Sequence, residues 1–310
     1  MTSDPSTRAD RPAPTSSPAG IGAAVTAVTA WGLGNVLIAW VPMNGLAVAF
    51  WRLLAGSLIY VPILYLRGGR LRLEAFRIGW KGGVAFGANV ATFFVALRMT
   101  TVANAVTIAA LQPLVIMGFA VVMFGERVRL RHIGCALGAT GGVALVAFGA
   151  ASSGTGSIGG DLVAGVALLT WAAYFITSKT ARTRLDTFEY MTVLNIVAFL
   201  VVAPVALVSG QVTSGDGGLT PARLGLIVGI VLIPGSGHIL MNWAHQHTTL
   251  LLTSLLTLAM PVLSTVMAMI FLDQDVVASQ MAGIAIVLVA LAIVIVGDSR
   301  WPDRPQEITT

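Results

Sequence analysis

The sequence predicts an all-α membrane protein, with ten transmembrane helices arranged as two five-helix repeats of inverted topology. Composition is the first of three observations behind this prediction. Hydrophobic residues make up 56% of the 310 positions and charged residues only 10%, whereas a soluble domain has about 25% charged residues. The other two observations are a series of apolar segments of membrane-spanning length and an internal repeat. Because so few charges cannot cover a water-facing surface, we expect a lipid bilayer around the chain.

Apolar segments recur along the chain, each of about 20 residues, enough to cross about 30 Å of hydrocarbon as a helix. Five precede a Gly/Ser-rich linker at 151–160 and five follow it. The first repeat is therefore expected at 20–150 and the second at 161–298, with a disordered Pro- and Ser-rich tail at 1–19 and a second tail at 299–310. The predicted helices span residues 20–40, 45–66, 78–97, 101–124, 132–150, 161–179, 189–208, 223–244, 250–272 and 277–297.

The segment Leu97–Glu126 recurs in relaxed form from His245 onward, and the alignment places Pro113 on Pro261. Each repeat has an odd number of crossings, so the second repeat must run in the opposite sense to the first. Inverted repeats whose broken helices meet near the bilayer midplane are typical of alternating-access transporters. Each proline removes a helical hydrogen bond, so we expect two pseudo-symmetric bent helices that act as frame and hinge rather than as a binding surface.

The basic residues predict the orientation of the chain. Of the 18 Lys and Arg residues, 15 fall on the side of the predicted membrane that holds the N-terminus, two fall on the other side, and Arg52 lies within the second predicted helix. Cytoplasmic loops of membrane proteins are enriched in Lys and Arg. Both termini are therefore expected in the cytoplasm, on a multi-pass protein of the plasma membrane. The net charge of +5 follows from this topology, and we expect no nucleic-acid partner.

Polar and aromatic side chains lie inside several predicted helices, at spacings of three or four residues that place them on one helix face. Aromatic walls with a few amides suit a small, partly apolar molecule that is zwitterionic or neutral. The predicted substrate-binding residues are Trp31, Asn35, Asn89, Phe93, Trp171, Tyr174, His238 and Asn242. Helix packing is the alternative: Trp31 can simply fill space, while Asn35 and a neutral His238 can bond to neighbouring helices.

Arg52 is the only ionised residue well inside a predicted helix. Such a charge usually faces a partner or a wet cavity, although a long side chain can also reach the membrane surface. Both interpretations remain open, and we assign Arg52, with Pro113 and Pro261, to structural or hinge positions. All 13 acidic residues lie in tails, loops or helix ends, so no carboxylate is placed to relay a proton. We expect facilitated or exchange transport, with His238 as the alternative proton carrier because imidazole titrates near neutral pH.

Short motifs in the first repeat carry a family resemblance. They are Phe-Trp-Arg-Leu-Leu-Ala at 50–55, Gln-Pro at 112–113 and Phe-Gly-Glu-Arg at 124–127, followed by Gly134 in a Gly-rich helix. With ten predicted helices in two halves, they make the chain resemble the drug/metabolite transporter superfamily, and within it the EamA-type exporter family, over about residues 20–298. The second repeat departs from the pattern, with Asp-Gln-Asp at 273–275 and no counterpart of the arginine.

The resemblance implies a small-molecule transporter of the cell inner membrane. We expect a secondary transporter that exports an amino acid or a related zwitterionic or neutral solute by alternating access, as a monomer or weak homodimer. No cofactor, metal or catalytic residue is expected. A passive channel, a lipid-handling protein and an intramembrane enzyme remain alternatives. An enzyme could use His238 and His245, but a catalytic metal site ordinarily has three protein ligands and no known catalytic motif is present.

Overall fold

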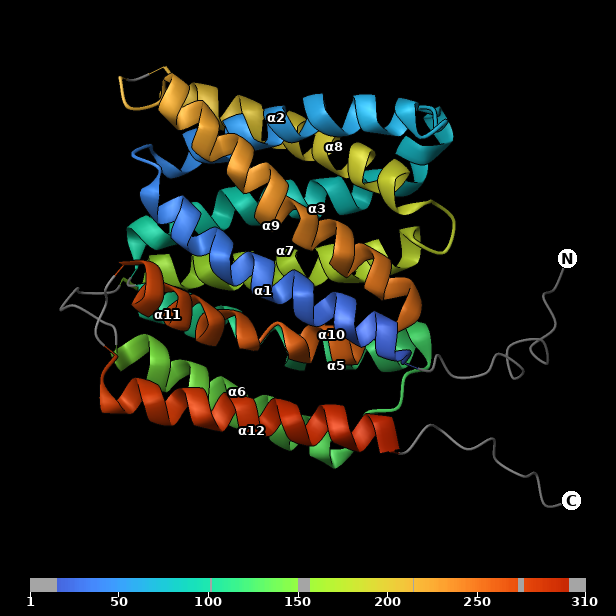
Figure 1. Cartoon of the computed structure of the whole chain (residues 1–310), viewed down its shortest axis with the longest axis vertical. Helices are drawn as coiled ribbons and strands as arrows, with labels where there is room; N and C mark the ends of the chain where they lie inside the picture. Colours follow the sequence, from blue (N-terminus) through green and yellow to red (C-terminus); the bar gives the residue numbers. More distant parts are fainter. Residues whose placement is uncertain (1–15, 101, 150–156, 214, 273–275, 301–310) are drawn as a thin grey trace, which may run out of the picture.

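The computed structural model describes residues 16–100, 102–149, 157–213, 215–272 and 276–300. The side chains of a few further residues, Asn35 among them, lie outside the described part. Within it the chain is all α-helical, as the composition predicts, and the helices lie side by side (Figure 1). They are α1 (Pro18–Trp40), α2 (Gly45–Leu66), α3 (Leu73–Met99), α4 (Val102–Ala109), α5 (Gln112–Phe124), α6 (Leu130–Gly149), α7 (Ile158–Ala181), α8 (Thr187–Val208), α9 (Pro221–His247), α10 (Leu250–Leu256), α11 (Ala259–Leu272) and α12 (Ala278–Arg300).

Helix α1 begins earlier than predicted. Ser17 is its N-cap and accepts a hydrogen bond from the backbone N–H of Gly20 at 3.0 Å, and Pro18 occupies the first helical position, where its missing N–H costs nothing. The backbone N–H of Ser17 also donates to the carbonyl of His247 at 2.9 Å. The boundary of the predicted tail at 1–19 is therefore corrected, because residues 16–19 belong to the bundle. Residues 1–15 lie outside the described part.

Nine segments of the described chain are long and apolar enough to cross a membrane, whereas the sequence predicts ten. Helix α3 is not among the nine, and it contains Glu74, Arg77, Lys81 and Asn89. Its 27 residues nevertheless exceed the roughly 20 that a crossing needs, and it packs against α7 and α8 near the middle of the bundle. The fold is that of a multi-pass helical membrane protein.

The two helices that the sequence predicts to be bent by proline are broken instead, into α4 and α5 in the first half of the chain and α10 and α11 in the second. At these breaks the N–H groups of Leu111 and Leu258 donate to carbonyls three residues back, at 3.1 and 3.0 Å. An α-helix uses the carbonyl four residues back. Proline has no N–H and clashes with that carbonyl, so Pro113 and Pro261 stop the helical hydrogen-bond pattern at both places.

The two halves, α1–α6 and α7–α12, interlock. The most extensive helix contacts are of α3 with α7, α1 with α9, α6 with α12, α3 with α8 and α2 with α8, and Figure 1 shows α1 crossing the bundle beside α9. These two helices come very close at Gly237, where an added Cβ would lie 2.9 Å from the carbonyl oxygen of Ala27. Small residues at such crossings let helix backbones approach. The halves are therefore joined along most of their length.

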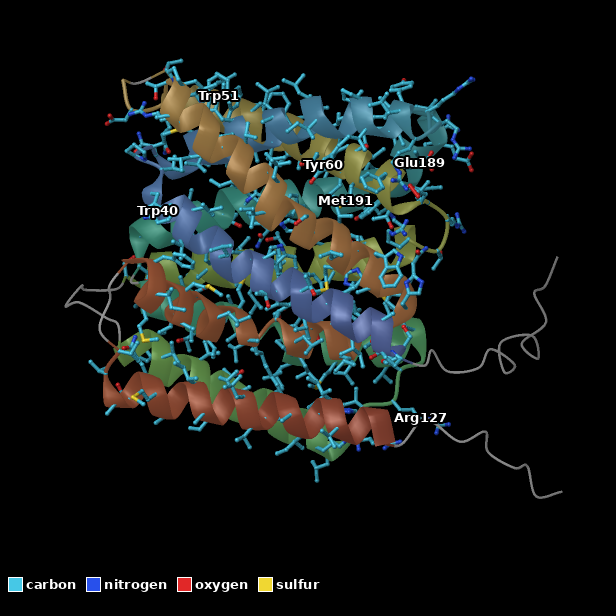
Figure 2. The ribbon with its side chains drawn as sticks, in the orientation of Figure 1. Trp40, Trp51, Tyr60, Arg127, Glu189 and Met191 are labelled. Carbon is cyan, nitrogen blue, oxygen red and sulfur yellow. The ribbon has the colours of Figure 1, made fainter. Side chains whose placement is uncertain are left out.

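Charged side chains gather at one end of the bundle, which we call the basic end. Figure 2 labels Arg127 and Glu189 there and Trp40 at the opposite end. Helix α1 begins and α12 ends at the basic end (Figure 1). Arg72 donates to Glu189 at 2.8 Å, and this hydrogen bond raises the pKa of Arg72. The pair joins the first half to the second.

Candidate functional site

A cavity of about 280 Å³ lies between the two halves. Its volume is near the lower limit of ligand pockets, which hold about 300–1,000 Å³, so it suits a small solute. Both helix breaks contribute to its wall, together with α1, α2, α3, α7 and α9. The lining residues are Trp31, Gly34, Ile38, Arg52, Phe86, Asn89, Val90, Phe93, Ala109, Ala110, Gln112, Ala167, Leu168, Trp171, Pro234, His238, Thr257, Leu258, Met260 and Pro261.

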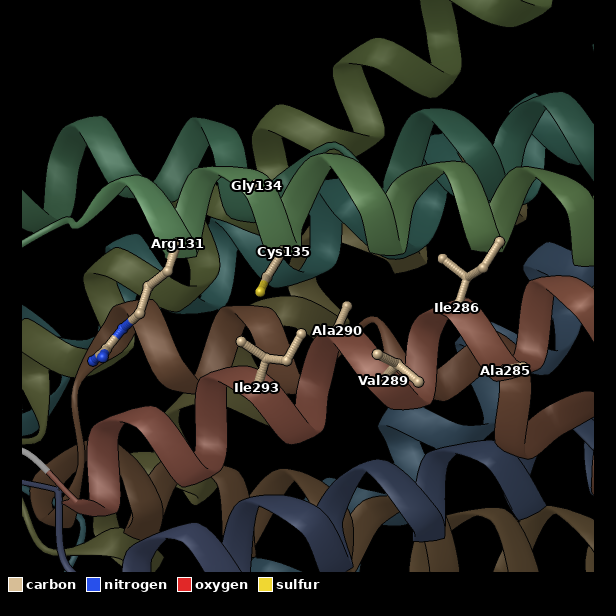
Figure 3. Close-up of a pocket in the computed structure, with 8 residues that line it drawn as sticks. All are labelled: Arg131, Gly134, Cys135, Ala285, Ile286, Val289, Ala290 and Ile293. Atoms are coloured by element: carbon tan, nitrogen blue, oxygen red, sulfur yellow. The ribbon is translucent and has the colours of Figure 1, made fainter.

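A wider groove of about 570 Å³ lies between α6 and α12, at the edge of the bundle (Figure 3). Apart from Arg131 at one end, its lining is apolar and includes the thiol of Cys135. These helices touch closely at Gly142, where an added Cβ would lie 2.8 Å from the carbonyl oxygen of Gly283. With so few polar groups to orient a solute, this groove is not the candidate site, and α6 and α12 serve as packing helices.

Aromatic rings form one wall of the central cavity. The ring centroids of Trp31 and Trp171 are 5.7 Å apart in an edge-to-face arrangement, and the His238 ring lies 4.9 Å from both Trp31 and Phe86. The indole N–H of Trp31 donates to the carbonyl of Pro234 at 3.1 Å, which fixes the ring against α9. Aromatic pairs in such geometries contribute about 0.5–1.5 kcal/mol beyond their burial. The wall is therefore a preformed apolar surface contributed by both halves.

A chain of hydrogen bonds runs behind this wall. The Asn242 amide N–H donates to the Tyr174 hydroxyl oxygen at 3.0 Å, and that hydroxyl lies 3.2 Å from Nδ1 of His238. The network ties α7 to α9, because Tyr174 belongs to the first of these helices and His238 and Asn242 belong to the second.

Asn89 also lines the cavity and joins the two halves. Its amide N–H donates to the carbonyl of Ala167 on α7 at 2.9 Å. An unsatisfied amide at this depth would be expensive, so the bond accounts for an asparagine in the middle of α3.

The first helix break brings Gln112 to the cavity, and the second brings Thr257. The Thr257 hydroxyl lies 3.0 Å from Oε1 of Gln112. The amide nitrogen of Gln112 is buried and has no partner among the described residues. This differs from the expectation that the stretch Leu97–Glu126 acts only as frame and hinge, because Ala109 and Gln112 lie on the cavity wall. The aligned prolines could have indicated this, since broken helices commonly form transporter binding sites.

The predicted site residues fall into three groups. Five of them, Trp31, Asn89, Phe93, Trp171 and His238, line the cavity. Tyr174 and Asn242 are not in the lining but support His238 from behind, while the side chain of Asn35 lies outside the described part. Among the positions assigned to structure or hinges, Arg52 and Pro261 line the cavity and Pro113 does not.

At the basic end, Glu126 fastens the two halves together. Its carboxylate accepts hydrogen bonds from the backbone N–H groups of Leu250 and Leu251, at 2.6 and 2.8 Å, and lies 3.1 Å from the ammonium of Lys179. Lys179 also donates to the carbonyl of Thr248 at 2.9 Å. We call Glu126, Lys179 and the first turn of α10 the latch. The left-handed backbone of Gly125, with φ of 64°, favours glycine and turns the chain sharply before Glu126.

Arg182 closes the same end beside the latch. It follows α7, lies almost fully buried, and donates to the carbonyl of Asn242 at 3.2 Å, to the hydroxyl of Thr187 at 2.5 Å and to Oε1 of Gln246 at 2.7 Å. Burial lowers its pKa to about 10, so the guanidinium remains charged at neutral pH. The carbonyl of Leu185 accepts a further hydrogen bond from it.

Interlocked helical halves, with a cavity between them that both helix breaks reach, define a membrane transport protein of the broken-helix class. Comparison with protein families identifies the family: residues 18–148 and 158–296 each match the EamA-like transporter family. The chain therefore belongs to this family, and as a member of a transporter family it is not an enzyme. One solved crystal structure has the same fold, with a TM-score of 0.74, 20% sequence identity, and coverage of 92% of this chain and 99% of the other. A search of curated proteins gives no significant match.

Proposed function

We propose that the protein is a secondary transporter that moves a small metabolite across the cytoplasmic membrane by alternating access. The observation that carries the proposal is the cavity whose wall includes both helix breaks, one from each half. Such a cavity can be exposed to either side when one half moves against the other. Its size and its aromatic wall support an amino acid or a related zwitterionic or neutral solute, and we propose export as the direction.

We further propose that the bundle crosses the membrane ten times, with α3 as the tenth crossing and the repeats at 20–150 and 161–298 inverted. The broken helices α4–α5 and α10–α11 count as one crossing each. The bias of basic residues places the basic end and both termini in the cytoplasm. In this orientation the latch is a cytoplasmic seal beneath the cavity, and it must open for a solute to enter from the cytoplasm.

Substrate identity can be sought by comparing the metabolites retained and released by cells that express or lack the protein. The proposal predicts a solute that accumulates outside only when the protein is present. Proteoliposomes loaded with that solute should then show saturation and counterflow, whereas a passive channel shows neither. Flux that rises linearly with concentration, or transfer of lipid alone, contradicts the carrier mechanism.

Transport should proceed at a similar rate with and without an imposed pH gradient. The described cavity lining contains no Asp or Glu, so no lining carboxylate is available as a proton carrier. The measurement is uptake of the identified solute into proteoliposomes at equal internal and external pH and across a gradient of one unit. Strong acceleration by the gradient would make His238 the candidate proton carrier.

Replacing Trp31 or Trp171 by Ala should lower the transport rate roughly ten-fold without preventing membrane insertion. Each change removes aromatic contacts of about 0.5–1.5 kcal/mol from the cavity wall, and 1.4 kcal/mol corresponds to a factor of ten. Trp40→Ala is the matched control, because Trp40 lies on α1 with 46% of its surface exposed. Uptake is measured at equal amounts of inserted protein. Unchanged flux in both cavity variants would remove these tryptophans from the solute pathway.

A further inference from the structure

Arg52 places a permanent positive charge on the cavity wall. It lines the cavity from α2, with its Cζ atom 5.6 Å from the ring centroid of Phe86. The ion pairs seen among the described residues lie at the basic end and do not involve it. Arg52 is partly exposed, and its guanidinium stays charged. A charge inside the membrane usually faces a partner or a wet cavity, and an anion bound in the cavity would give this one a partner.

Two further polar groups lie on the cavity wall. His238 lines the cavity, with Nδ1 in a hydrogen bond with the Tyr174 hydroxyl. Gln112 has a buried amide nitrogen with no partner among the described residues. Arg52 and the Gln112 amide are donors from two helices, α2 and α5, and the described lining has no acidic side chain to complement a cation.

The remaining wall is apolar and aromatic, with Trp31, Phe86 and Trp171 among its largest side chains. A small inorganic anion would leave this surface without a partner. An organic molecule with one anionic group and an apolar body can bind the donors through the anionic group and pack its apolar body against the aromatic rings, within a cavity of about 280 Å³.

We propose that the transported solute is recognised through a carboxylate that binds Arg52, with its apolar or aromatic body against the tryptophan wall. The inference rests on the proposed function, because it uses the same cavity, and it narrows the solute class to carboxylate-bearing molecules. An amino acid meets the requirement through its carboxylate alone. An ammonium group finds no acidic partner in the described lining, so a monocarboxylate should bind at least as tightly as the zwitterion of the same skeleton.

The test is binding of four probes that share a phenyl ring and differ in charge, measured on the purified full-length protein through its tryptophan fluorescence and thermal stability. The probes are 3-phenylpropionate, phenylalanine, 3-phenylpropionamide and phenethylamine. We expect the first two to bind at least ten-fold more tightly than the last two. Equal affinity for all four, or preference for the amine, overturns the inference. No binding by any of them overturns it as well.

Substitutions at Arg52 give an independent result. Arg52→Gln should weaken 3-phenylpropionate binding at least ten-fold, since hydrogen bonds to charged groups are among the strongest in proteins. Arg52→Lys should retain part of the affinity, because it keeps the charge but loses the planar fork. Unchanged affinity in a folded Arg52→Gln protein contradicts the proposal. If the four probes bind with equal affinity and the protein still shows counterflow, the carboxylate inference is wrong and the proposed carrier function stands. If the carboxylates bind more tightly but counterflow is absent, the carrier function is wrong and the carboxylate inference stands.

Discussion

Replacing Lys179 by Met should destabilise the protein by about 3–5 kcal/mol, the usual cost of removing one partner of a buried ion pair. Glu126 is 4% exposed and would keep its carboxylate at the N-terminus of α10 without a counter-charge. Lys81→Met is the control, because Lys81 is an exposed lysine in the first half of α3, the helix that begins at the basic end. Thermal unfolding in a mild detergent gives the comparison.

A double-mutant cycle separates the latch from general packing. Glu126→Gln alone should also be destabilising, because Lys179 then loses its charged partner and retains the carbonyl of Thr248. The combined Glu126→Gln, Lys179→Met variant should lose less stability than the sum of the two single changes, since coupled neighbours are not additive. Simple additivity would show that the two side chains act independently and would contradict the latch.

Introducing Val at Gly237 should destabilise the bundle and abolish transport. An added Cβ would lie 2.8 Å from Nε1 of Trp31 and 2.9 Å from the carbonyl oxygen of Ala27. The second neighbour is backbone, so α9 has to move away from α1 and weaken the hydrogen bond from Trp31 to Pro234. Overpacking of a well-packed interior typically costs about 1–3 kcal/mol, and a backbone clash belongs at the upper end.

Gly229→Val is the matched control on the same helix, because a Cβ built on Gly229 meets nothing within 4 Å. The two substitutions share the same change in helix propensity and apolar volume, so a difference between them isolates the contact with α1. Detergent gel filtration measures the folded fraction, and proteoliposome uptake measures activity. Similar behaviour of the two variants would mean that α1 and α9 can separate without consequence.

The sequence predicts the elements of this fold well because the bilayer constrains them strongly. Helix lengths follow from membrane thickness, and each apolar segment of the sequence coincides with a helix or a broken helix of the fold, α3 included. Aligned prolines indicate where the backbone is interrupted. The breaks themselves fall two to four residues before Pro113 and Pro261, because proline disrupts the turn that precedes it.

The site could be predicted only in part, because periodicity indicates which residues share a helix face but not which helix lies opposite. Trp171 and Tyr174 share a face of α7, yet the first meets the cavity and the second bonds to His238 behind it. For Arg52, the sequence favours a structural role at least as much as ligand contact, and the structure places it on the cavity wall. The role of Glu126 depends on backbone groups more than 120 residues away, and local sequence cannot indicate such a partner.

The interlocking of α1, α2 and α3 with α7, α8 and α9 has a consequence for how the protein is made. The ribosome delivers the first half before the helices that complete it exist. During that interval the Asn89 amide lacks its Ala167 carbonyl, and Arg72 lacks Glu189. We therefore expect α1–α3 to remain in the bilayer without these partners, in contact with lipid or an insertion factor, until α7–α9 are inserted. Quality control of this chain should act on the unfinished first half, and ribosome stalling between α6 and α7 should leave a product that is degraded.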